Sequence, residues 1–74
     1  MDINKSIGML LKKKREEKGY SLSQVAGLIE RSKTCIYYWE TGRNVIDVVM
    51  LDKICKVYGT DMYSFIDELK NDEI

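Results

Sequence analysis

The sequence predicts an all-α domain built from five helices. The chain has 74 residues, which is enough for one small domain and too few for two. It contains no proline, strong helix formers are frequent along it, and an apolar share of 45% supports a compact core. Cap residues and apolar residues at helical spacing divide the chain into five segments.

The first helix is expected over residues 4–18. Ile7 and Leu11 are four residues apart, so they fall on one face of a helix and indicate the side that is buried. Gly19 follows the last helical residue, at a position where glycine commonly ends a helix.

The second and third helices are joined by a very short connector. The second opens at Ser21, which forms with Gln24 the S-x-x-Q pattern of a capping box. Ser32 is expected to cap the third helix, which ends before Gly42. Only the residues "ERS" separate the two, and this predicts helices that cross steeply, as in a helix-turn-helix. The second helix carries the apolar residues Val25, Ala26, Leu28 and Ile29.

The fourth helix opens at Asp47 and stops at Gly59, and a short fifth helix opens at Thr60 or Asp61. The apolar stripe of the fourth helix consists of Val48, Leu51, Ile54, Cys55 and Tyr58. That of the fifth consists of Met62, Phe65, Ile66 and Leu69. We expect residues 1–66 to form the domain, and residues 67–74 to hold the end of the last helix and an acidic, frayed tail.

The third helix carries three consecutive aromatic residues, Tyr37, Tyr38 and Trp39. Successive side chains point about 100° apart, so with Ile36 directed inward, Trp39 and Glu40 lie on the flanks of the core face. The outer face then holds Thr34, Tyr37, Tyr38 and Thr41, preceded by Lys33. Such hydroxyl groups form a hydrogen-bonding surface that fits a DNA major groove. Ordinary exposed tyrosines on a solvated helix are the alternative.

Glu40 lies beside the core face, where an unpaired carboxylate is costly. Arg15 is close to the buried stripe of the first helix. We therefore expect an Arg15–Glu40 ion pair that clamps the first helix to the third.

The net charge of zero conceals an uneven distribution. Residues 1–43 hold nine Lys or Arg and five Asp or Glu, a net +4. Residues 44–74 hold three and seven, a net −4. A basic first half is consistent with a polyanionic partner such as DNA.

Several function classes are disfavoured by composition. With no histidine and only Cys35 and Cys55, a zinc site lacks ligands, and we expect two reduced, buried or half-buried thiols and no cofactor. The general acid–base and nucleophile constellations of enzymes are missing, so we expect no catalysis.

No apolar stretch reaches the roughly 18 to 20 residues of a membrane span, and no signal peptide is visible. We expect a cytoplasmic protein that contacts no membrane and takes no small-molecule ligand.

The chain resembles the phage-repressor or Cro-type helix-turn-helix family (XRE family) from residue 7 to about residue 66. The resemblance is carried by "IG" and "R..KG" in the first helix, "VA" in the second, and "S...I..WE.G" in the third, where Ser32, Trp39 and Glu40 stand. It continues through "LDKICKVYG". The family fold is a compact five-helix lambda-repressor-like domain with the helix-turn-helix in helices 2 and 3. In that family the counterparts of Arg15 and Glu40 pair.

The resemblance implies that the start of the third helix enters the major groove. The positions implied to contact base edges or nearby phosphates are Lys33, Thr34, Tyr37 and Tyr38, and those implied to touch the backbone are Thr41 and Arg43. Family members usually bind pseudo-palindromic double-stranded DNA as homodimers, with half-sites about one helical turn apart. A sequence-specific transcriptional repressor is the expected function. The alternative is a protein-interaction module of the same fold, such as an antitoxin-type partner.

Four positions depart from the family pattern. Leu22 replaces a Gln that contacts phosphate, and Lys14 stands where an apolar residue is typical, so its stem is expected to cover the core. Glu30 holds a turn position usually given to Gly, at a cost of roughly 1 kcal/mol, and Arg31 replaces an apolar residue.

The run "KKKR", residues 12–15, fans out around a helix, so its members cannot all face one partner. Further apolar residues occupy positions that are often polar in the family, namely Met9, Leu10, Val45, Ile46 and Val49. They are either scattered exposed residues or a self-association surface at the start of the fourth helix or on the fifth.

Overall fold

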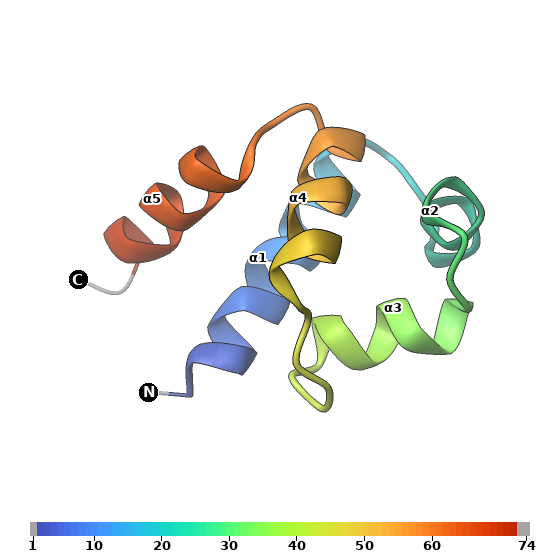
Figure 1. Ribbon diagram of the computed structural model, residues 1–74, viewed down its shortest axis with the longest axis horizontal. Helices are drawn as coiled ribbons and strands as arrows, with labels where there is room; N and C mark the ends of the chain where they lie inside the picture. Colours follow the sequence, from blue (N-terminus) through green and yellow to red (C-terminus); the bar gives the residue numbers. More distant parts are fainter. Residues whose placement is uncertain (1, 73–74) are drawn as a thin grey trace.

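The computed structural model describes residues 2–72, and the predicted all-α fold is confirmed (Figure 1). The five helices are α1 (Ile3–Glu17), α2 (Leu22–Ile29), α3 (Lys33–Glu40), α4 (Val48–Val57) and α5 (Met62–Asp72). The fifth helix is longer than predicted, since it continues through residues 71–72 of the tail. The predicted fraying otherwise concerns residues 73–74, which lie outside the described residues.

Each helix begins where a polar side chain caps it. Ser21 and Gln24 form the predicted capping box, with N···O distances of 3.1 and 2.7 Å. The side chain of Ser32 accepts from the Cys35 N–H at 3.1 Å, and that of Asp47 accepts from the Met50 N–H at 2.8 Å. Asp2 caps α1, so this helix begins one residue earlier than predicted. These local signals are the reason that the helix boundaries could be read from the sequence.

The helices enclose one core, to which all five contribute. In Figure 1, α1 and α4 occupy the centre, α2 and α3 form one end of the molecule, and α5 lies at the other end. The largest fully buried side chains are Leu11, Val25, Ile29, Ile36, Ile54, Cys55 and Phe65. Trp39 is buried as predicted.

Some predicted faces were wrong at individual residues. Leu10 and Ile46 are buried core residues and not surface ones, whereas Val48, placed on the stripe of α4, is exposed. Leu28 and Ile66 are exposed as well, although both were grouped with the apolar residues of their helices.

Gly8 brings α1 and α3 into close contact. A Cβ at this position would lie under 3.0 Å from the carbonyl oxygens of Trp39 and Glu40, a distance that real Cβ atoms do not tolerate. The two backbones can therefore approach only because residue 8 has no side chain.

The turn between α2 and α3 contains a strained residue. Glu30 adopts the left-handed conformation with φ 58° and ψ 45°, and it is the one non-glycine residue with positive φ among residues 2–72. Glu30 therefore takes the left-handed conformation that a glycine at this turn position would adopt, although it has a side chain. The Arg31 N–H donates to the Ala26 carbonyl at 3.0 Å and closes the end of α2.

Lys14 joins α1 to α5. Its Nζ lies 2.8 Å from Oε2 of Glu68, and both side chains are partly buried. Lys14 stands where the family has an apolar residue, and its charge is balanced by the carboxylate of Glu68 in the last helix, 54 residues away. The stem was expected to cover the core, but the partner of the ammonium group was not foreseen.

Candidate nucleic-acid interface

The orientation of α3 is fixed by the predicted ion pair between Arg15 and Glu40. Arg15 Nε donates to Oε2 at 2.7 Å and Nη2 donates to Oε1 at 3.0 Å, which is a bidentate arrangement. The side chains are only 12% and 4% exposed. A third donor, Nη1, reaches the Tyr20 carbonyl at 2.9 Å. The hydrogen bonds to Glu40 raise the pKa of Arg15 above its ordinary value, so the guanidinium stays charged.

The outer face of α3 is open to solvent at three of the four predicted base-contact positions. Lys33 and Thr34 are exposed in the first turn, and Tyr37 is 50% exposed one turn later. Tyr38 departs from the prediction, because it is half-buried. The helical wheel put its ring outside, but the chain that follows α3 folds back over it.

That following segment is held tightly against the end of α3. The backbone N–H groups of Arg43 and Asn44 donate to the Tyr38 carbonyl at 2.9 and 3.3 Å. Gly42, with φ +77°, makes the reversal possible. The guanidinium carbon of Arg43 lies 5.2 Å from the centroid of the Tyr38 ring, a cation–π distance, and the Arg43 side chain remains exposed.

Thr41 is exposed, but its hydroxyl is already engaged. It donates to the Tyr37 carbonyl at 3.0 Å, so toward a second partner it acts as an acceptor unless this bond is exchanged. The Thr41 hydroxyl can therefore donate to a phosphate only if it gives up this intrahelical hydrogen bond.

The four residues of the "KKKR" run lie in four different environments, as the helical fan predicted. Lys14 pairs with Glu68, Arg15 pairs with Glu40, and Lys13 is exposed. Lys12 is exposed and borders the outer face of α3. It lines an open groove together with Met9, Leu22, Tyr37 and Thr41, and the Arg15–Glu40 pair also borders this groove.

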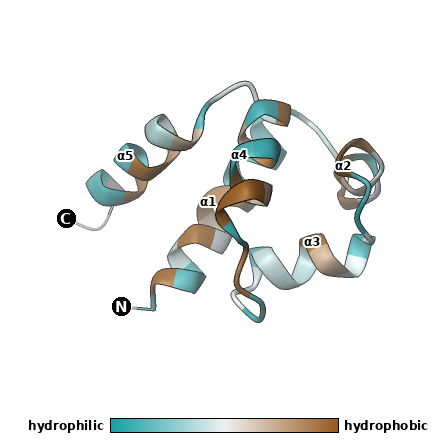
Figure 2. Ribbon diagram, in the orientation of Figure 1, coloured by the Kyte–Doolittle hydropathy of each residue, from teal (hydrophilic) through white to brown (hydrophobic). Residues whose placement is uncertain are grey.

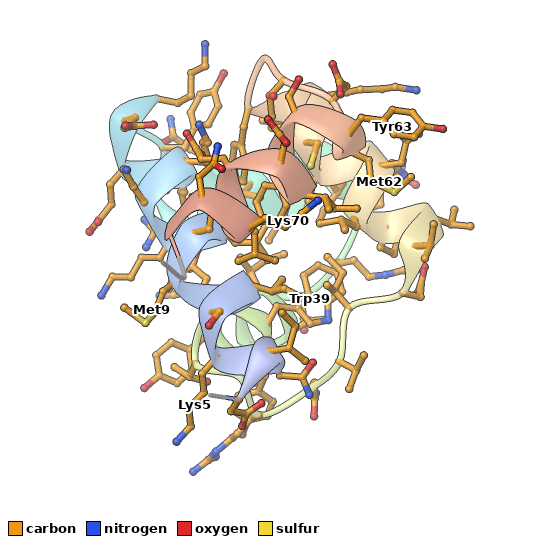
Figure 3. The ribbon with its side chains drawn as sticks, turned by 90° about the vertical axis from the view of Figure 1, so that its left-hand side faces the viewer. Lys5, Met9, Trp39, Met62, Tyr63 and Lys70 are labelled. Atoms are coloured by element: carbon orange, nitrogen blue, oxygen red, sulfur yellow. The ribbon has the colours of Figure 1, made fainter. Side chains whose placement is uncertain are left out.

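Lys12 is therefore a candidate phosphate contact that the sequence pattern did not single out. The signal that identifies it is its position one turn before Arg15, on the face of α1 nearest to α3. Figure 3 shows Met9, which lines the same groove, projecting outward from α1 at the left edge of the view, whereas Trp39 lies toward the centre.

Other kinds of site find no support in the described part of the chain. No group of three or more potential metal ligands occurs within residues 2–72. None of the helices seen in this range is long and apolar enough to cross a membrane. Cys35 is half-buried and Cys55 is buried, and both are free thiols.

Comparison with known proteins agrees with this geometry. Residues 6–62 match the family described as "Helix-turn-helix domain". A candidate HTH-type transcriptional regulatory protein of Saccharolobus islandicus is 36% identical over 53 residues, covering 72% of this chain and 17% of the relative. One of Sulfurisphaera tokodaii is 36% identical over 52 residues, covering 70% and 18%. The chain thus spans less than a fifth of the length of these relatives.

Solved structures show the same fold. The clp gene regulator ClgR from Corynebacterium glutamicum superposes with a TM-score of 0.88 at 21% identity, covering 95% of this chain and 74% of that one. The restriction-modification controller protein C.Esp1396I, solved as a tetramer with its natural 35 base-pair operator, gives 0.84 at 21% identity, covering 96% and 93%. Apo-HppE gives 0.77 at 24% identity, but the match covers only 35% of that chain.

These identities below 25% establish the fold alone, whereas the match over residues 6–62 identifies the family. The fold, the short turn between α2 and α3 and the clamp behind α3 all agree with that match. The chain belongs to the helix-turn-helix domain family and has the fold of its phage-repressor or Cro-type (XRE) members.

Proposed function

We propose that the protein binds double-stranded DNA in a sequence-specific manner and represses transcription by occupying an operator. The observation that carries the proposal is the outer face of α3. Lys33, Thr34 and Tyr37 are exposed there, on a helix whose opposite side is fixed by the Arg15–Glu40 pair. An α-helix fits the width of the major groove of B-DNA, and a rigid helix presents its side chains in one register.

The charge distribution supports the same orientation. Around the face of α3, Lys12, Lys33 and Arg43 are exposed cations that can meet phosphates on either side of the groove. The excess of acidic residues lies in the sequence from residue 44 onward, the part of the chain that contains α4 and α5. α5 is at the end of the molecule away from α2 and most of α3 (Figure 1), so its carboxylates need not approach DNA.

We further propose that two copies bind a pseudo-palindrome as a homodimer. Three exposed valines follow Arg43 and form what we call the valine patch, namely Val45, Val48 and Val49, which are 72%, 65% and 76% exposed. Figure 2 shows this hydrophobic segment along the loop into α4 and its first turn. The domain measures 33 × 24 × 22 Å, so its longest dimension is comparable to the spacing of about 34 Å between half-sites one helical turn apart.

The valine patch suits a weak pairing. Three valine side chains offer on the order of 300 Å², well below the roughly 800 Å² per partner of a stable interface. We therefore expect dimerisation to be completed on DNA, with cooperative binding to the two half-sites.

The test is selection of bound duplexes from a random library, followed by affinity measurement on the selected sequence. We expect an inverted repeat. Tyr37→Ala should weaken binding at least tenfold, whereas Tyr63→Ala, which removes a 79% exposed tyrosine from α5, should leave it unchanged. Figure 3 shows Tyr63 projecting outward from α5.

Failure to enrich any duplex with folded protein would overturn the proposal. If the protein then co-purified with the product of a neighbouring gene, the protein-interaction module would be favoured. Equal weakening by both tyrosine variants would contradict the assignment of α3 as the reading helix.

A further inference from the structure

We infer that Tyr38 is a positioning residue for Arg43 and not a base reader. The inference rests on the proposed function, because Arg43 must meet DNA for its position to matter. The sequence led us to expect that Tyr38 contacts DNA directly. In the structure its contacts are instead to Arg43, through which it would act.

Tyr38 holds Arg43 at both ends. At the backbone, the Tyr38 carbonyl accepts the N–H of Arg43 at 2.9 Å, which fixes where the residue leaves the end of α3. At the side chain, the guanidinium carbon lies 5.2 Å from the ring centroid. A single residue thus sets both the origin and the direction of the arginine.

The ring of Tyr38 is poorly available for contact with a base. It is half-buried, and one of its faces carries the guanidinium group. The ring of Tyr37 approaches it with centroids 6.1 Å apart and planes tilted by 47°. Tyr37, in contrast, is half exposed and has no cation on its face among the described residues.

The segment that carries Arg43 is also fixed by its neighbours. The Asn44 N–H shares the Tyr38 carbonyl at 3.3 Å, and the Gly42 N–H donates to the Trp39 carbonyl at 3.3 Å. A Cβ on Gly42 would come within 2.8 Å of the Lys5 side chain, so this reversal is packed directly against α1. The arginine therefore extends from an ordered loop.

Such ordering has a consequence for binding. An arginine on a free loop loses rotamer freedom when it contacts a phosphate, whereas one already stacked on a ring has lost much of that freedom beforehand. Removing the ring should reduce affinity by roughly 2- to 5-fold, by the usual strength of an exposed cation–π contact. Because phosphates are alike in every sequence, the loss should be the same on all duplexes.

The experiment compares Tyr38→Phe, Tyr38→Leu, Arg43→Ala and the Tyr38→Leu/Arg43→Ala double variant on the selected duplex and on single-base variants of it. Tyr38→Phe keeps the ring and should bind as the wild type does, with the same base preferences. Tyr38→Leu should weaken binding to every duplex by the same factor. Once Arg43 is absent, Tyr38→Leu should have no further effect, since its contribution passes through the arginine. Tyr37→Leu is the matched control and should change the base preferences.

A measurement on the free protein tests the contact without DNA. The side-chain protons of Arg43 should show ring-current shifts in NMR spectra of the wild type and of Tyr38→Phe, and lose them in Tyr38→Leu. Thermal unfolding of each variant separates loss of fold from loss of binding, and Tyr38→Phe carries the test if Tyr38→Leu does not fold.

Three outcomes would overturn the inference. They are altered base preference in Tyr38→Phe, additive losses in the double variant, and unshifted Arg43 protons in the wild type. If the wild type bound no duplex, the proposed function would fail with it. Binding by the wild type together with any of the three outcomes would remove only the role of Tyr38.

Discussion

Arg15 and Glu40 join α1 to α3 through two parallel hydrogen bonds, 25 residues apart in the sequence. The carboxylate is almost fully buried and the guanidinium nearly so. Both charges are largely removed from solvent, so each depends on the other. The pair fixes the orientation of α3 relative to α1. Its net contribution to folding stability is small, but losing one partner is costly.

Arg15→Ala should destabilise the protein strongly. It leaves the Glu40 carboxylate buried without its partner, and breaking one side of a buried ion pair typically costs about 3–5 kcal/mol. We expect the melting temperature to fall by well over 10 °C, because about 1 kcal/mol shifts it by roughly 4–8 °C in a domain of this size. Lys13→Ala, an exposed neighbour, is the control and should change stability by less than about 0.5 kcal/mol. Equal melting of the two variants would refute the clamp.

Gly8→Ala and Gly27→Ala should have opposite effects. A methyl group at residue 8 meets the carbonyl oxygens of Trp39 and Glu40, so α1 must move, at a cost of about 2 kcal/mol or more. A methyl group at residue 27 meets nothing within 4 Å and should stabilise α2 by about 0.5–1 kcal/mol. Urea unfolding of both variants provides the comparison. A tolerated alanine at residue 8 would show that the helices can separate without loss.

Glu30→Gly should stabilise the protein by about 0.5–1 kcal/mol. The residue has a φ of 58°, which a side chain disfavours and glycine adopts freely. Glu16→Gly, at an exposed position inside α1, should instead cost about 1 kcal/mol. Denaturant midpoints measured side by side would reveal the difference in sign, and a loss of stability in both variants would contradict the strain at Glu30.

Tyr58→Phe should be neutral or stabilising by up to about 1 kcal/mol. The ring is buried, and its hydroxyl has no hydrogen-bond partner in the described residues, so removing the oxygen relieves an unpaired polar group. Burial, followed by the charge of Glu40, raises the pKa of Tyr58, which indicates the same enclosed environment. Tyr63→Phe is the exposed control and should change nothing. A clear loss in Tyr58→Phe, measured by calorimetry, would imply a bound water or another partner for the hydroxyl.

Stability should decline at alkaline pH through Cys55. Burial, with the nearby charges of Asp52 and Asp61, raises the pKa of this thiol from 9.0 to about 11. The folded state therefore keeps its proton where the unfolded chain loses it. The contribution is full below about pH 9 and is lost as the pH rises through 11. Cys55→Ala should flatten this part of the profile of unfolding free energy against pH, whereas Cys35→Ala should retain it.

Much of the fold could be predicted because its signals are local. The caps at Ser21, Ser32 and Asp47 depend on residues three positions apart, and all are present. The Arg15–Glu40 pair could be predicted because the helical wheel placed Glu40 beside the core face and Arg15 close to the buried stripe of the first helix. Family resemblance then supplied the same pairing independently.

Two of the errors concern residues whose burial is decided by the chain between helices. Ile46 precedes α4 and is buried in the core, and in the first turn of α4 Met50 is buried whereas Val48 is exposed. The ring of Tyr38 is covered by residues that follow the helix. Neither effect appears in the periodicity of a single helix. Contact between α3 and DNA is a prediction, as is the set of residues that makes it.

The pairing of Lys14 with Glu68 also bears on the order in which the molecule is assembled. During synthesis, the Arg15–Glu40 contact can close as soon as α3 has emerged from the ribosome, whereas Lys14 must wait for a residue 54 positions later. Until then the surface of α1 that packs against α5 remains exposed. We therefore expect a nascent chain to organise its α1–α3 unit first and to close its core with the last helix, so that a stalled or clipped chain exposes apolar surface beside Lys14.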